Sequence, residues 1–306
     1  MTKKKHQKNY DLFSKFDFFV PDPRGIVGLT IWFIVGALLG SVVTVIFTAI
    51  FGDLENLTSY AMLVAYPLMF IPPMMYASLK SNENSFFGKG VKLSSGHYKP
   101  LGGAFCALLV MVATLCASFI ADGVGSLLPD MPEWLEDVME SMTQGELWAD
   151  ILCVSIFAPV FEEWLCRGMV LRGLLNYEHK NKDGEKVKGI KPVWAIVISA
   201  AFFAVIHGNP WQAVTAFLLG SLFGYVYYRT GSIKLTMLMH CTNNTFAIIL
   251  SNIDKLSEVN SWLEIMKPAM FVALMLFSAA FLWYFYKKFE TISLQRSQGN
   301  CDEIGE

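Results

Sequence analysis

The sequence predicts an all-α fold: a polytopic integral membrane bundle of about eight transmembrane helices. Of the 306 residues, 54% are hydrophobic and only 16% are charged, whereas about 25% of residues are charged in an ordinary soluble domain. The mean hydropathy is +0.43. Apolar segments recur along the chain, and most are about as long as the 20 residues that a membrane-spanning helix needs.

The candidate spans, in chain order, are residues 26–51, 60–79, 101–121, 148–171, 193–207, 211–228, 233–250 and 268–286. The fifth and sixth are short, and Gly208-Asn209-Pro210 separates them. Glycine after a helix and proline shortly beyond it are stop signals, so we expect a tight turn there. The third loop, over residues 132–144, is either a short amphipathic helix or an irregular acidic loop. Gly36/Gly40 and Gly220/Gly224 predict close packing between helices within the chain.

The positive charges predict how the chain is oriented. With eight spans, every cluster of lysine and arginine falls on one side of the membrane: the N-terminal segment, the second, fourth and sixth loops, and the C-terminal tail. Arg172, at the end of the fourth span, belongs to this set. Residues 122–150, on the opposite side, carry acidic residues and no lysine or arginine. The positive-inside rule therefore places both termini in the cytoplasm, and the compact basic tail favours the plasma membrane of a bacterium.

The fourth span contains the most informative residues, Glu162, Glu163 and Arg167. Charged side chains at membrane depth cost roughly 2.5–3.5 kcal/mol each on insertion scales, so they are paired or functional. Glu163 and Arg167 are spaced i, i+4 in the favourable order for an ion pair. Glu162 points about 100° away from Glu163, and Cys166 stands at its i+4 position. We therefore expect Glu162 to face a cavity as a general base.

Two later spans carry further polar side chains. His207 ends the fifth span, and His240 and Asn244 are spaced i, i+4 on the seventh. An imidazole and an amide on one face can both donate to a developing negative oxygen. We expect Glu162, His207, His240 and Asn244 to line one catalytic cavity within the membrane.

These residues form three motifs in order, each on a separate apolar segment. They are Glu-Glu-x-x-x-Arg (Glu162, Glu163, Arg167), Phe-x-x-x-His (Phe203, His207) and His-x-x-x-Asn (His240, Asn244). The set resembles the CPBP intramembrane metalloprotease family, which comprises CAAX proteases and bacteriocin-processing proteins and is also called Abi. The resemblance covers about a third of the chain.

The resemblance implies an intramembrane protease, a hydrolase similar to the CAAX prenyl endopeptidases, acting on a membrane-associated or prenylated peptide. Carried over by motif, Glu162 and His207 would activate water, and His240 and Asn244 would stabilise the oxyanion. Glu163, Arg167 and Phe203 would support the site. The partners implied are the lipid bilayer and a peptide or protein substrate, with no nucleic acid.

The role of a metal stays open at the level of sequence. Glu162, His207 and His240 are the candidate ligands of one divalent ion such as zinc, with a fourth position open. The sequence lacks the HExxH spacing that puts two zinc ligands on one helix. Glu162 and His207 are equally able to polarise water without a metal.

Two other functions compete with proteolysis. A non-hydrolytic immunity or scaffold protein, of the bacteriocin self-immunity type, would bind peptide in the same cavity. A transporter would use the Glu/His set as a proton relay, but it would be expected to show inverted repeats, which the sequence does not display.

The spans and motifs together predict how the chain is organised: a basic N-terminus (1–25), N-terminal helices with an acidic outer loop (26–147), a catalytic core (148–250), and a last span with a tail (251–306).

Overall fold

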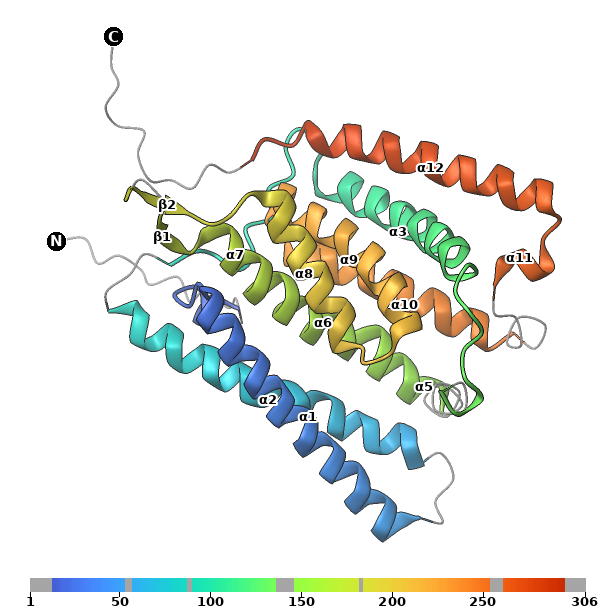
Figure 1. Ribbon diagram of the computed structural model, residues 1–306, viewed down its shortest axis with the longest axis horizontal. Helices are drawn as coiled ribbons and strands as arrows, with labels where there is room; N and C mark the ends of the chain where they lie inside the picture. Colours follow the sequence, from blue (N-terminus) through green and yellow to red (C-terminus); the bar gives the residue numbers. More distant parts are fainter. Residues whose placement is uncertain are drawn as a thin grey trace.

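The computed structural model describes residues 13–52, 57–86, 90–135, 146–181, 184–253 and 261–294. In this part of the chain the protein is a helical bundle with one small β-hairpin (Figure 1). The longer helices are α1 (Pro23–Phe51), α2 (Leu57–Ser85), α3 (Gly103–Gly125), α8 (Pro192–Ile206), α9 (Pro210–Thr230), α10 (Ile233–Ser251) and α12 (Pro268–Glu290). The short helices η1 (Ser14–Phe16) and α11 (Trp262–Ile265) precede α1 and α12.

The segment that contains the two glutamates is helical without a break, but it is not a uniform α-helix. It runs through α5 (Leu147–Asp150), the π-helix η2 (Ile151–Phe157), α6 (Ala158–Glu163), the π-helix η3 (Trp164–Leu171) and α7 (Arg172–Asn176). We call these consecutive elements the central segment. Since π-helical turns are rare and concentrate at functional sites, two of them flanking α6 mark the region of the glutamates as unusual.

Every predicted span is helical, and within the described ranges four helices are long and apolar enough to cross a membrane: α1, α2, α3 and α12. The chain is therefore a mostly helical integral membrane protein. Helix α8 has 15 residues and rises about 22 Å, less than the hydrocarbon core of about 30 Å. The total of eight spans, the orientation and the cavity within the membrane stay predictions.

The all-α prediction misses one element. Strands β1 (Glu178–Lys180) and β2 (Lys186–Lys188) pair antiparallel, with His179 opposite Val187. Gly184 has φ +82 in the connecting turn, a conformation that favours glycine. Of the predicted amphipathic segment 132–144, residues 133–135 are helical, and residues 136–144 lie outside the described part.

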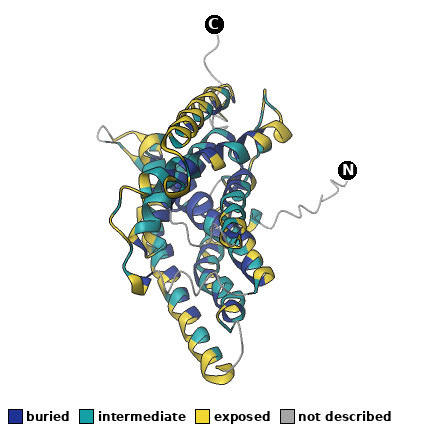
Figure 2. Cartoon of the chain, turned by 90° about the vertical axis from the view of Figure 1, so that its right-hand side faces the viewer, coloured by how far each residue is buried: buried dark blue, intermediate teal, exposed yellow. Residues whose placement is uncertain are grey.

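The helices are arranged around the central segment. The α1–α2 pair lies along one side of the bundle and α3 with α12 along the other, with the central segment, α8, α9 and α10 between them (Figure 1). Only 17% of the most apolar window of α1 and 11% of that of α12 is buried, against 50% for α3. Buried residues gather in the middle of the bundle (Figure 2), so the apolar surfaces of α1 and α12 are suited to face lipid.

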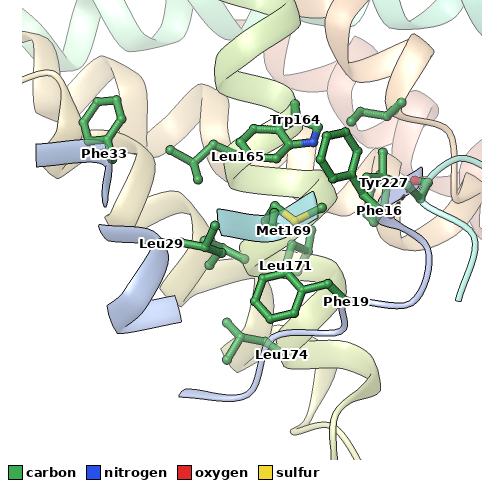
Figure 3. Packing of buried hydrophobic residues seen from close by; sticks show 14 of the residues in the cluster. Phe16, Phe19, Leu29, Phe33, Trp164, Leu165, Met169, Leu171, Leu174 and Tyr227 are labelled. Atoms are coloured by element: carbon green, nitrogen blue, oxygen red, sulfur yellow. Dashed lines mark hydrogen bonds between the residues drawn. The ribbon is translucent and has the colours of Figure 1, made fainter. Parts of the chain in front are cut away.

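A hydrophobic core forms around η3, immediately after the glutamates. Trp164, Leu165 and Met169 are fully buried and lie among side chains from the N-terminal segment and α1 (Figure 3). The rings of Phe16 and Trp164 lie 5.2 Å apart. This packing holds the central segment against the N-terminal third of the chain.

Arg172, which the charge pattern counts among the positive charges on the cytoplasmic side, lies inside the protein. Its side chain is buried, with 1% exposed. The guanidinium donates to the backbone carbonyls of Gly168, Val91, Phe16 and Phe19. Arginine carries five N–H donors, and these four carbonyls together with that of Asp17 accept from them. Arg172 thus ties the segments before α1 and after α2 to the end of the central segment.

Glycines bring α1 and α2 into backbone contact, as predicted for packing within the chain. A Cβ atom at Gly36 would overlap the backbone carbonyl of Met69. One at Gly40 would lie 3.0 Å from the carbonyl oxygen of Ala65.

We expect Gly36→Ala to destabilise the protein by about 1–3 kcal/mol, because overpacking against backbone cannot be relieved by a side-chain rotation. The melting temperature in detergent micelles measures this effect. Gly125→Ala at the end of α3 is the control, since no atom lies within 4 Å of its added Cβ. Equal melting temperatures for the two variants would contradict the close approach of α1 and α2.

Candidate active site

The predicted ion pair between Glu163 and Arg167 is present and completely buried. Arg167 Nη1 lies 2.8 Å from Glu163 Oε1, and both side chains are 0% exposed. Arg167 Nη2 donates to the carbonyl of Gly220 on α9 at 2.9 Å. A Cβ at Gly220 would lie 3.1 Å from that nitrogen, so the glycine leaves room for the guanidinium.

Aromatic rings cover the arginine. The Arg167 guanidinium carbon lies 4.5 Å from the ring centroid of Phe203 and 5.4 Å from that of Phe223. Arginine over an aromatic face gains cation–π attraction, which is larger away from water. The Glu163 carboxylate and the two rings together compensate the buried positive charge.

His240 contacts both glutamates: the sequence grouped it with Glu162, but it did not predict the bond to Glu163. Its Nδ1 lies 3.2 Å from Glu163 Oε1, and its Nε2 lies 3.9 Å from Glu162 Oε2. Glu163 is therefore bonded to Arg167 and to His240 at once. The sequence paired Glu163 with Arg167 and gave no sign of its bond to His240, because the approach of α10 to α6 is a matter of tertiary packing.

Glu162 is held from another direction. The hydroxyl of Tyr66, on α2, donates to Glu162 Oε1. Within the described residues, Oε2 of Glu162 is buried and has no hydrogen-bond partner. The side chain is 12% exposed. Glu163 Oε2 is likewise buried without a partner among the described residues, so what distinguishes Glu162 is that it does not pair with Arg167 and is partly exposed.

His207 caps the C-terminus of α8, next to the predicted tight turn. Its Nδ1 lies 2.7 Å from the carbonyl oxygen of Phe203. A carbonyl only accepts, so we assign the proton to Nδ1, which leaves a lone pair on Nε2. Gly208 has φ +66, and the Asn209 side chain accepts from the Trp211 amide at 3.0 Å.

The Phe203 ring lies between the two histidines. Its centroid is 4.8 Å from that of His207 and 5.4 Å from that of His240, edge-on in both cases. Phe203 therefore contacts Arg167, His207 and His240, and His207 joins the group through this ring.

Asn244 lies on the same face of α10 as His240, and its amide is engaged with the central segment. Asn244 Nδ2 donates to the carbonyl of Val154 in η2 at 2.8 Å. Its Oδ1 accepts from Asn243 Nδ2 at 3.1 Å, and Ser118 donates to Asn243 Oδ1 at 2.6 Å. One of the two N–H bonds of Asn244 is thus used within the protein, so only the other is available to a ligand.

The candidate metal ligands do not fit a metal site. Among the described residues, no three His, Cys, Asp or Glu side chains converge as a metal-binding group. Glu162 Oε1 is engaged by Tyr66, and His207 reaches the group only through Phe203. The three-ligand arrangement of Glu162, His207 and His240 expected for zinc is not formed by this geometry.

The fold and the buried cluster define an integral membrane protein that holds a group of ionisable residues, Glu162, Glu163, Arg167 and His240, inside its helical bundle. Residues 144–246 match the family model described as Type II CAAX prenyl endopeptidase Rce1-like. The match covers all three motifs and confirms the resemblance of this segment to the CPBP family of CAAX proteases. Searches of the curated proteins and of the solved structures find no match.

Sequence reasoning missed three residues that contact the charged cluster: Tyr66, Gly220 and Phe223. Tyr66 stands among apolar residues of α2, and nothing in its local spacing relates it to Glu162. Gly220 was noted only for its spacing to Gly224, although its carbonyl accepts from Arg167.

We expect Arg167→Leu to destabilise the protein by about 3–5 kcal/mol, because it leaves the Glu163 carboxylate buried without its cation. The yield of monodisperse protein and its melting temperature measure the loss. The control is Lys80→Leu, which breaks an exposed ion pair with Glu83 and is expected to change the melting temperature little. A melting temperature of Arg167→Leu equal to that of the control would show that the buried pair is dispensable.

Proposed function

We propose that this protein is an intramembrane endopeptidase that uses Glu162 as its general base. The observation that carries the proposal is the different state of the two adjacent glutamates. Glu163 is fully buried and neutralised by Arg167, and His240 bonds to the same oxygen, whereas Glu162 is 12% exposed and pairs with no lysine or arginine among the described residues. The match of residues 144–246 to the CAAX endopeptidases supports peptide-bond hydrolysis as the reaction.

In the proposed reaction, a water molecule is polarised by Glu162 Oε2 and by the lone pair on His207 Nε2. Its oxygen attacks the carbonyl carbon of the scissile peptide bond while Glu162 takes up the proton. The tetrahedral intermediate then collapses. The C–N bond breaks, and the proton passes to the leaving amine, so the carboxylate is restored at the end of the cycle.

His240 and Asn244 are proposed to stabilise the oxyanion. In the doubly protonated form of His240, Nδ1 donates to Glu163 and Nε2 is a second donor. The Asn244 amide has one N–H bonded to Val154 and a second that can be directed at the substrate. Donors fixed before the reaction, in a site that excludes water, stabilise developing charge without reorganisation.

Glu163, Arg167 and Phe203 are proposed to support these groups. Glu163 orients His240 through Nδ1, and Phe203 separates the two histidines. Arg167 neutralises Glu163 and connects it to α9. Misplacement of any catalytic group by about 1 Å can cost a hundredfold in rate, which is why a rigid support is needed.

We propose a lipid-anchored peptide as the substrate class, with a prenylated C-terminal tail as the first member to test. A peptide held at the bilayer by its own lipid reaches helices that expose apolar faces without crossing bulk water. The apolar exposure of α1 and α12 and the family match support this class.

Glu162→Gln and His207→Ala are expected to lower the cleavage rate by about 10²–10⁴-fold while the protein remains folded, because each removes a group that handles the proton. The assay uses purified protein in liposomes and a fluorogenic farnesylated peptide that ends in a CAAX sequence. A proteomic comparison of membranes containing wild type or Glu162→Ala searches for other substrates. The matched control is His97→Ala, since His97 bonds to Ser293 at the surface.

Full cleavage by either site variant would reject the proposed mechanism. Full protection of cells by Glu162→Ala against a bacteriocin, with no substrate accumulating uncleaved, would instead favour the non-hydrolytic immunity function.

Chelators are expected to change the cleavage rate by less than about twofold, because the candidate ligands do not form the closed donor set that holds zinc in proteins. The measurement compares protein dialysed against EDTA or 1,10-phenanthroline with untreated protein, and it includes elemental analysis of both. Loss of activity on dialysis with recovery on adding zinc would overturn this expectation.

A further inference from the structure

A tyrosine from outside the matched segment reaches Glu162. Tyr66 lies on α2, and its hydroxyl donates to Glu162 Oε1, whereas the family match begins at residue 144. The N-terminal helices therefore contribute a direct hydrogen bond to the carboxylate on which the proposed function depends.

This hydrogen bond makes the two carboxylate oxygens unequal. Oε1 is taken by Tyr66, and Oε2 is left 3.9 Å from His240 Nε2 with no hydrogen-bond partner among the described residues. A carboxylate held at one oxygen cannot rotate freely, so the direction of the lone pairs on the other is set. A hydroxyl donor also offsets part of the cost of an ionised carboxylate in apolar surroundings.

The Tyr66 ring is itself held in place by an aromatic stack. It lies 5.7 Å from the ring of Phe70, which is 1% exposed. Phe70 stacks on Phe161 at 5.2 Å with an interplanar angle of 15°. Because Phe161 directly precedes Glu162, one stack holds both partners of the hydrogen bond.

The backbone beside Tyr66 is fixed by helix α1. A Cβ at Gly40 would lie 3.0 Å from the carbonyl oxygen of Ala65, the residue before Tyr66. The Phe33 ring of α1 lies 5.3 Å from that of Phe70. The α1–α2 pair thus presents the Tyr66 hydroxyl to the central segment from a rigid support.

We infer that Tyr66 is a positioning residue for Glu162, which orients the carboxylate so that Oε2 faces the reaction. The inference rests on the proposed function for its catalytic consequence, but the contact itself is independent of the substrate. If Tyr66 has this role, the α1–α2 pair contributes a residue directly to the site, in addition to anchoring the protein in the bilayer.

Tyr66→Phe removes only the hydroxyl and retains the ring in the aromatic stack. We expect kcat for the farnesylated CAAX reporter to fall roughly tenfold to a hundredfold, as for loss of a hydrogen bond to a charged group. KM and the melting temperature are expected to stay near the wild-type values. A merely structural hydroxyl would lower the melting temperature and leave kcat unchanged for the folded fraction.

The matched control is Tyr76→Phe on the same helix. Tyr76 packs edge-on against Phe19 at 5.7 Å, away from Glu162. This control measures the effect of removing a tyrosine hydroxyl from α2 without touching the site, and it is expected to retain the wild-type kcat.

A second measurement needs no substrate. Dicyclohexylcarbodiimide is an apolar reagent that couples to protonated carboxyl groups within membranes. Labelling of Glu162, located by mass spectrometry in the monodisperse fraction, is expected to rise severalfold in Tyr66→Phe, because Oε1 is released from the hydroxyl that occupies it and becomes available to the reagent. Tyr76→Phe is expected to label like the wild type.

The outcomes separate the inference from the proposed function. If Glu162→Gln cleaves normally, the proposed function fails, whatever Tyr66→Phe does. If Glu162→Gln is inactive but Tyr66→Phe keeps the wild-type kcat, the inference is overturned and the function stands. Should the reporter not be cleaved by the wild type, unchanged labelling of Glu162 in Tyr66→Phe overturns the inference, and the expected increase supports it.

Discussion

The buried ion pair between Glu163 and Arg167 is the interaction on which the rest of the site depends. Two charges without solvent access need partners on every side, and those partners come from three different helices. Arg167 bonds to the carbonyl of Gly220 on α9 and lies against Phe203 on α8. Glu163 bonds to His240 on α10. Satisfying one ion pair therefore fixes α8, α9 and α10 around the central segment.

The same arrangement explains why two adjacent glutamates have different roles. Glu163 points into the arginine and histidine cluster, whereas Glu162, a third of a helical turn away, points toward α2 and meets the Tyr66 hydroxyl. His240 lies between them and contacts both. On one side of the resulting group Arg167 compensates the Glu163 carboxylate, and on the other side the Glu162 carboxylate meets no lysine or arginine among the described residues. That asymmetry is what general-base chemistry requires.

The membrane decides where such a cluster can lie. Irregular or charged structure at membrane depth is tolerated where protein rather than lipid surrounds it. The two least buried of the apolar helices, α1 and α12, lie on the outside of the bundle (Figure 1). The π-helical stretches and every residue of the three motifs lie on elements between them. The α1–α2 pair has two functions in this arrangement, because its outer surface suits lipid while Tyr66 reaches the site.

Local spacing in the sequence determined the helical segments, the i, i+4 pair of Glu163 and Arg167, and the turn at Gly208-Asn209-Pro210, since helix geometry and turn chemistry act over a few residues. The three motifs also identified the region that matches the CAAX endopeptidases. Only the tertiary structure decided that Tyr66 binds Glu162, that His240 bridges both glutamates, and that Asn244 bonds to Val154. It also buried Arg172, which the charge pattern counted among the loop cations. Those contacts join residues dozens of positions apart, so they depend on how whole helices pack. Helical periodicity predicts which face of a helix is buried, but it does not predict which side chain of another helix that face contacts.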